Sequence, residues 1–217
     1  MQYIIFVIEE IGKGISASLL LFFLTLIFSM PLGLLVCFGR MSKFRPLAVV
    51  SGFVISVLRG TPLMLQLVVV FFGPYYVFGI PVSSTWRFWA AIVGFSINYA
   101  AYFAEIYRSG IQSIPKGQYE AAEVLGYSRA QTFCKIIFPQ MVKNVLPPVT
   151  NEIITLTKDT SLAFVLAYAE MFTLAKQVAA AEASIAPLFV AGLFYYVFNY
   201  VIAFVMDRVE RRLAYYQ

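Results

Sequence analysis

Long apolar runs separated by short polar stretches dominate this chain. A helix needs about 20 apolar residues to cross the hydrocarbon core of a bilayer, which is about 30 Å thick. Five runs reach about that length or exceed it, and they cover residues 15–38, 47–78, 88–107, 142–168 and 185–206. The pattern therefore predicts an all-α, polytopic membrane protein with five transmembrane helices, folded as a single domain over residues 1–217.

Two of these runs contain helix-breaking residues. The second run would be about 48 Å long as one helix at about 1.5 Å per residue, which exceeds the hydrocarbon core. The run therefore starts in the cytoplasm, tilts strongly, or breaks at Gly60–Pro62. Alternatively, Pro62 is the first residue of the main span. The fourth run is predicted to be broken by Pro147 and Pro148.

The first eight residues are apolar but lack a basic region and are followed by Glu9 and Glu10. A cleavable signal peptide normally begins with positive charge, so this segment does not fit one. We expect a short interfacial helix lying on the outer membrane surface.

The composition supports a membrane protein, and the distribution of basic residues predicts its orientation in the membrane. Apolar residues make up 61% of the chain and charged residues 12%, against about 25% charged residues in soluble domains. Eleven of the 16 basic residues lie in the linkers after the first and third runs and in the tail: Arg40, Lys43, Arg45, Arg108, Lys116, Arg129, Lys135, Lys143, Arg208, Arg211 and Arg212. The opposite face holds only Lys13, Arg87 and Lys176. The positive-inside rule then places the N-terminus outside and the C-terminus in the cytoplasm.

Several chemistries are absent from the sequence. The chain has no histidine and only two cysteines, Cys37 and Cys134, so neither a His/Cys metal cluster nor a disulfide framework can form. It lacks G-x-x-x-x-G-K-[ST], so we expect no ATP site and no cofactor in this chain. An intramembrane enzyme is disfavoured because no Ser-Lys or Asp-Asp pair is placed on facing helices. Basic residues spread over separate membrane loops also argue against nucleic-acid binding.

The segment 109–143 is the largest polar stretch, and its core, about 109–141, forms an insert between the third and fourth runs. Residues 120–125 read as a short helix closed by Gly126. Ser128 and Gln131 form a capping box that starts a second helix, which Pro139 ends or kinks. Taken alone, the insert could be a plain connection between two spans.

The spacing within this insert is more informative. Glu120-Ala121-Ala122, then Gly126, then Ile136-x-Phe138-Pro139 resembles the EAA motif of ABC importer permeases, with Phe138 in place of the usual leucine. Further stretches resemble the polar amino acid permeases of that superfamily: Arg59-Gly60-Thr61-Pro62, 98–105 with Tyr102, Pro115-x-Gly117-Gln118, Pro139-Gln140 and Asn151-Glu152.

This resemblance implies a type I ABC importer permease in a bacterial inner membrane. Its coupling helix would dock in a groove of the ATPase subunit through Glu120, Ala121, Ala122 and Gly126. The implied partners are a dimer of ABC ATPase subunits that carry ATP and Mg²⁺, a second permease subunit that is identical or homologous, and an extracellular or periplasmic solute-binding protein. The competing hypothesis is a stand-alone channel or secondary carrier for small polar solutes, in which the motif spacing is accidental.

Ionisable residues at bilayer depth are costly and are candidates for a functional site. Two polar stripes at helical spacing, on the third and fourth runs, predict a lined cavity. The candidate substrate-binding residues are Arg59, Thr61, Asn98, Tyr102, Glu105, Asn151, Glu152, Thr155, Lys158, Asp159, Thr160 and Ser161. The five charges among them sum to −1, which favours a basic amino acid, with a neutral polar amino acid next. Alternatively, these charges neutralise one another and specify helix packing.

Overall fold

The computed structural model describes residues 2–213, and every regular element in that range is helical. The first half of the chain forms α1 (Gln2–Gly12), α2 (Ile15–Arg40), α3 (Arg45–Gly60), α4 (Leu63–Phe78) and α5 (Ser84–Gln112). The second half forms α6 (Lys116–Val124), α7 (Arg129–Thr132), a π-helical segment (Phe133–Ile137), α8 (Phe138–Asp159), a 3₁₀ segment (Thr160–Leu166), α9 (Met171–Ala181) and α10 (Ala186–Leu213). The predicted all-α class is confirmed.

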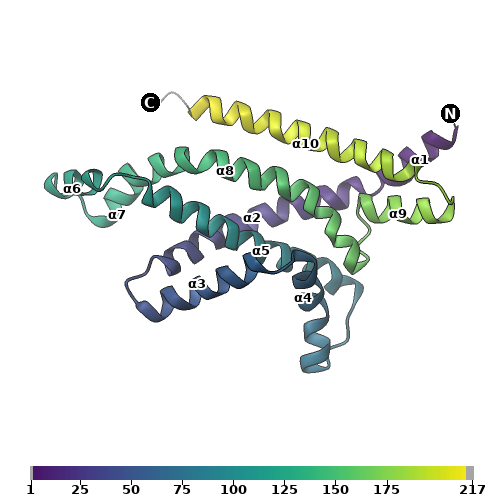
Figure 1. Cartoon of the computed structure of the whole chain (residues 1–217), viewed down its shortest axis with the longest axis horizontal. Coiled ribbons are helices and arrows are strands. Elements are labelled where there is room, and N and C mark those ends of the chain that lie inside the picture. Colours follow the sequence, from purple (N-terminus) through teal and green to yellow (C-terminus); the bar gives the residue numbers. More distant parts are fainter. Residues whose placement is uncertain (1, 214–217) are drawn as a thin grey trace.

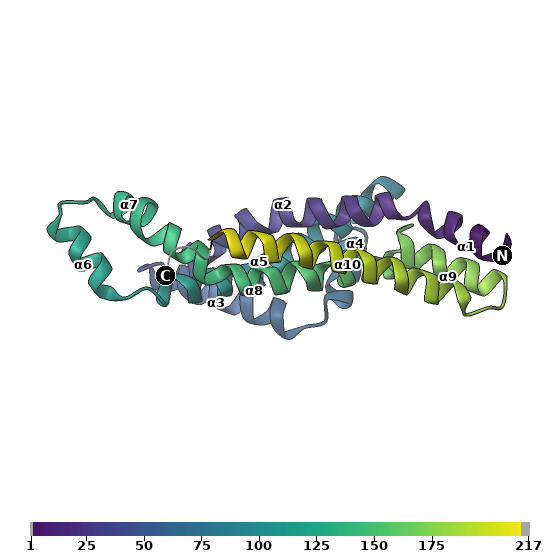
Figure 2. The same ribbon diagram turned by 90° about the horizontal axis from the view of Figure 1, so that it is seen from above.

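The long helices α2, α5, α8 and α10 lie lengthwise in one bundle (Figures 1 and 2). The α6–α7 insert forms one end of the molecule, and α1 and α9 form the other. Among the described residues, α10 and the continuous stretch 2–40 are long and apolar enough to cross a membrane, with up to four spans if each bent helix pair counts as one.

Helix α5 forms the centre of the bundle. Its buried side chains include Phe95, Tyr99 and Phe103, and α2 packs along much of its length. Gly33 of α2 permits this approach, since a Cβ there would lie 2.7 Å from the Cβ of Phe103. A helix surrounded by other helices needs no continuous apolar surface toward lipid, which explains why α5 carries more polar groups than α2 or α10.

The second predicted span breaks at Gly60–Pro62, so 47–78 is not one straight helix. Helices α3 and α4 meet there at 110°, and α4 projects away from the long axis in Figure 1. The proline ring forces the residue before it into an extended conformation, and Thr61 has φ −118° and ψ 148°. Gln66 and Asn98 satisfy backbone groups freed by the break. The Gln66 Nε2 donates to the carbonyls of Leu58 (2.8 Å) and Thr61 (3.1 Å), and the Asn98 Nδ2 donates to that of Leu58 (3.2 Å).

The expected break in the fourth span is absent. Pro147 and Pro148 lie inside α8, which continues past them to Asp159. Of the two alternatives for Pro139, ending a helix or kinking it, the first is wrong, because α7, the π-helical segment and α8 follow one another without a gap. The wider π turn before Pro139 lets the chain continue where a proline nitrogen donates no hydrogen bond.

The short helix expected over the first eight residues is present as part of the bundle, and Met1 of this segment lies outside the described residues. Helix α1 continues directly into α2 and buries Val7 and Ile11 against α9 and α10. Helix α9 was not predicted. The buried Glu170 caps it, accepting hydrogen bonds of 2.7 Å from the backbone amides of Phe172 and Thr173, and Tyr195 donates to the same carboxylate.

Candidate functional site

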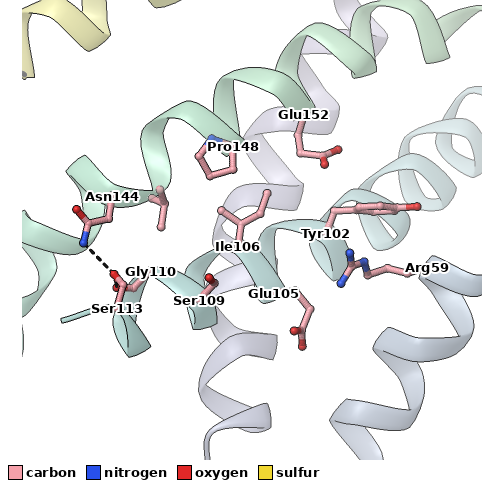
Figure 3. Close-up of a pocket in the computed structure, with 11 residues that line it drawn as sticks. Arg59, Tyr102, Glu105, Ile106, Ser109, Gly110, Ser113, Asn144, Pro148 and Glu152 are labelled. Atoms are coloured by element: carbon pink, nitrogen blue, oxygen red, sulfur yellow. Dashed lines mark hydrogen bonds between the residues drawn. The ribbon is translucent and has the colours of Figure 1, made fainter. Parts of the chain in front are cut away.

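A cavity of about 450 Å³ lies between α3, α5 and α8 (Figure 3). Its volume is in the range of small-molecule sites. The residues that line it are Arg59, Tyr102, Glu105, Ile106, Ser109, Gly110, Ser113, Asn144, Val145, Pro148 and Glu152. We call it the central cavity. It brings together four of the predicted substrate residues: Arg59, Tyr102, Glu105 and Glu152.

The three charged side chains of the central cavity differ in their contacts. The guanidinium carbon of Arg59 lies 5.1 Å from the centre of the Tyr102 ring, a cation–π contact. Glu105 accepts hydrogen bonds from Nε (3.0 Å) and Nη2 (2.6 Å) of Arg108. Among the described residues, Glu152 forms no ion pair, and Figure 3 shows its side chain directed toward Tyr102. The expected sum of −1 omitted Arg108, which balances Glu105, so the charge sum alone does not favour a basic substrate.

Other predicted substrate residues lie outside the central cavity lining. Asn98 and Thr61 belong to the α3–α4 break, where Gln66 contacts both side chains. The Asp159 carboxylate accepts a 2.7 Å hydrogen bond from the hydroxyl of Tyr99. The hydroxyls of Thr160 and Ser161 donate to backbone carbonyls one turn earlier. These side chains are occupied by structural contacts.

Asn151, Thr155 and Lys158 form an exposed polar stripe on α8. Their spacing of four and three residues places them on one face of the helix, beside Glu152. A polar stripe facing lipid is unfavourable, so this face requires a water-filled passage or a second protein subunit.

Three polar residues of the lining were missed: Ser109, Ser113 and Asn144. The Asn144 Nδ2 donates to Ser113 Oγ (2.8 Å) and joins α8 to α5. The sequence carried a signal for the two serines, since they extend the stripe of Tyr102 and Glu105 by two further turns. That stripe was cut short because the third span was taken to end at 107, whereas α5 continues to Gln112.

The insert folds largely as predicted. Gly126 has φ +76°, a conformation that residues with a Cβ resist, and it follows the end of α6. Ser128 Oγ accepts from the Gln131 amide, and the Gln131 side chain accepts from the Ser128 amide, which confirms the capping box. Helix α6 begins at Lys116, four residues before the predicted start. Partial burial raises the pKa of the Tyr119 phenol above its usual value.

The four predicted coupling residues differ in their exposure to solvent. Ala122 is fully buried within the chain, whereas Glu120, Ala121 and Gly126 are exposed. Val124 and Leu125 are the most exposed large apolar residues of the insert, at 87% and 72%. Exposed apolar side chains that are adjacent in this way make the surface a candidate for a protein contact. We call Ala121, Val124 and Leu125 the exposed ridge of the insert.

The family of binding-protein-dependent transport system inner membrane components matches residues 29–215. The chain belongs to this family. It is a permease subunit of an amino acid ABC importer, in which a separate ATPase hydrolyses ATP. The predictions of family and of function as an ABC permease are confirmed, and the stand-alone carrier and intramembrane enzyme are excluded.

The permease is similar to curated proteins along nearly its whole length. It is 39% identical to the arginine transport system permease protein ArtQ of Bacillus subtilis (strain 168), over 95% of this chain and 93% of that protein. It is 37% identical to the L-cystine transport system permease protein TcyB of the same organism, over 95% of this chain and 87% of that protein.

A solved structure supports the same fold. The crystal structure of an amino acid ABC transporter with histidines contains a chain that is 30% identical to the permease, with a TM-score of 0.88 over 97% of both chains. The type I permease fold is therefore shown. The roles of the individual residues in the central cavity and the insert stay predictions.

Proposed function

We propose that the permease carries cationic amino acids of the arginine type across the bacterial inner membrane, and that its central cavity forms half of the passage. The observation that carries this proposal is the Glu152 carboxylate, which lines the cavity without an ion pair among the described residues. A carboxylate at this depth is costly unless a cation joins it, and a positively charged substrate supplies one.

An amino acid has charges of both signs, and the cavity offers a partner for each. Arg59 can bind the α-carboxylate, since a guanidinium matches the geometry of a carboxylate with two parallel hydrogen bonds. Glu152 can then accept from the cationic side chain of the substrate. The arginine permease among the relatives supports a cationic substrate, and the cystine permease makes a neutral polar amino acid the second candidate.

The working importer needs further subunits. The exposed polar stripe of α8, Asn151, Thr155 and Lys158, fits a second permease, identical or homologous, that closes the other half of the passage. The exposed ridge and Glu120 fit a groove on an ATPase subunit, which would carry ATP and Mg²⁺. An extracellular or periplasmic binding protein would deliver the amino acid on the face opposite the insert.

The proposed orientation places the N-terminus outside and the insert in the cytoplasm, in agreement with the distribution of Lys and Arg. Cys134 is exposed in the insert and Cys37 is buried in α2, so the natural chain already carries a probe. A membrane-impermeant maleimide should label the permease, expressed without its ATPase, in inside-out vesicles and leave it unlabelled in intact spheroplasts. Labelling in intact spheroplasts that disappears in a Cys134→Ser variant would place the insert outside and contradict the proposed orientation.

Uptake by the reconstituted importer tests the substrate class. Proteoliposomes containing the permease, its ATPase and its binding protein should accumulate labelled arginine only when ATP is supplied. Unlabelled arginine and lysine should compete at least about tenfold better than glutamine or cystine, because only the cations can bind Glu152 with their side chains. Equal competition by glutamine would show that the importer does not select for a cationic side chain and would contradict the proposed substrate class.

A further inference from the structure

Helices α5 and α8 touch on both sides of the central cavity. At the end nearer the insert, Gly110 packs directly on Val145, and Asn144 bonds to Ser113. At the other end, the hydroxyl of Tyr99 donates to Asp159 Oδ2 at 2.7 Å. The cavity walls that carry Tyr102 and Glu152 lie between these two contacts. The separation of the two walls is therefore set at both ends.

The contact between Tyr99 and Asp159 is a partly buried hydrogen bond between a phenol and a carboxyl group. Tyr99 is 2% exposed, and the Asp159 carboxylate is partly buried at the last residue of α8. A hydrogen bond from a hydroxyl to an ionised carboxylate is stronger than one between neutral groups, and the 2.7 Å between Tyr99 and Asp159 is a normal hydrogen-bond length. Beyond Asp159 the chain tightens into the 3₁₀ segment, so this bond lies at the point where α8 ends.

Tyr99 also reaches the cavity through its own ring. Its centre lies 6.2 Å from that of Tyr102, and Tyr102 in turn holds the guanidinium of Arg59 at 5.1 Å. One series of contacts thus runs from Asp159 through Tyr99 and Tyr102 to Arg59. It joins α8, α5 and α3, which are the three helices that line the cavity.

We propose that Tyr99 and Asp159 form a positioning pair that holds the Glu152 wall and the Tyr102–Arg59 wall at the spacing required to bind the amino acid. This inference rests on the proposed function of the central cavity. It gives Asp159 a role other than the direct substrate contact expected from the sequence, because its carboxylate is already bonded to Tyr99.

The test is a double-mutant cycle on the purified permease–ATPase complex without binding protein. The wild-type complex is screened with arginine, glutamine and cystine, and the dissociation constant is then measured for the amino acid that binds most tightly. Tyr99→Phe keeps the ring and removes the hydroxyl, and Asp159→Asn keeps the acceptor oxygen and removes the charge. Tyr107→Phe is the matched control, because Tyr107 is buried on α5 and stacks on Phe103 outside the cavity lining.

We expect Tyr99→Phe to raise the dissociation constant about tenfold and Asp159→Asn about threefold, with Tyr107→Phe within about twofold of wild type. The double variant should match Tyr99→Phe, since the two side chains act through one bond. Melting temperatures of the complexes are recorded alongside, because a merely structural bond would lower them and leave the affinity unchanged.

Each outcome has one meaning. An unchanged dissociation constant in Tyr99→Phe, or fully additive effects in the double variant, would overturn the positioning pair. A wild-type complex that prefers glutamine or cystine would contradict the proposed substrate class and leave the cycle measurable with that ligand. Binding of none of the three would contradict both proposals.

Discussion

Replacing Glu152 with glutamine should weaken arginine binding to the permease–ATPase complex by about 30- to 150-fold. This corresponds to about 2–3 kcal/mol, the typical contribution of a hydrogen bond to a charged group that water does not screen. Glutamine preserves the size of the side chain and removes only the negative charge. The loss should be much smaller for a neutral amino acid, because such a ligand lacks the side-chain cation. Equilibrium binding of labelled arginine and glutamine to the same preparations measures both effects.

Glu210 provides the control for this substitution. It lies on α10 and contacts α8 as well, accepting a 2.7 Å hydrogen bond from the hydroxyl of Thr150, but it does not line the central cavity. Glu210→Gln should leave the arginine dissociation constant within about twofold of wild type. Equal losses in Glu210→Gln and Glu152→Gln would show that the effect comes from α8 in general and would remove Glu152 from the binding site.

A charge on the exposed ridge of the insert should separate the permease from its ATPase. Leu125 is 72% exposed in the free chain, and a carboxylate placed there would be buried without a partner in an apolar protein contact, at a cost of several kcal/mol. Leu125→Asp should therefore reduce co-purification of the ATPase by more than about tenfold and abolish ATP-driven uptake. Pull-down of the ATPase with the tagged permease, quantified per permease, gives the result.

The matched control places the same charge on a surface outside the insert. Ile80 is 54% exposed in the connection between α4 and α5, far from the insert in sequence. Ile80→Asp should leave ATPase co-purification unchanged. Full co-purification in Leu125→Asp would mean that the exposed ridge does not contact the ATPase, and the coupling surface would then lie elsewhere on the permease.

Much of the fold could be predicted because its signals are local. Apolar runs of membrane length define α2, α5 and α10, and Gly126 and the Ser128–Gln131 capping box are determined by residues a few positions apart. The effects of proline were harder to predict. The helix breaks at Pro62, where Gln66 and Asn98 donate to the freed carbonyls. By contrast, α8 continues through Pro147 and Pro148. Whether a proline breaks a helix depends on contacts with other helices, and the spacing of apolar residues along the sequence does not reveal these contacts.

Only part of the lining of the central cavity could be predicted, because only some of its signals are local. Helical spacing placed Tyr102 and Glu105 on one face, and the depth of Arg59 and Glu152 in apolar runs marked them as functional candidates. Spacing along one helix cannot reveal which side chain a neighbouring helix engages. Asp159 is therefore among the predicted substrate residues although Tyr99 binds it, and the predicted charge sum includes Glu105 without Arg108, which binds it.

The central claim is that the amino acid lies between Arg59 and Glu152. A structure of the assembled importer with bound arginine tests it most directly. The account predicts ligand density in the central cavity, with the arginine carboxylate toward Arg59 and a cationic group within hydrogen-bond distance of Glu152. Arginine density elsewhere in the permease, with an empty central cavity, would contradict it.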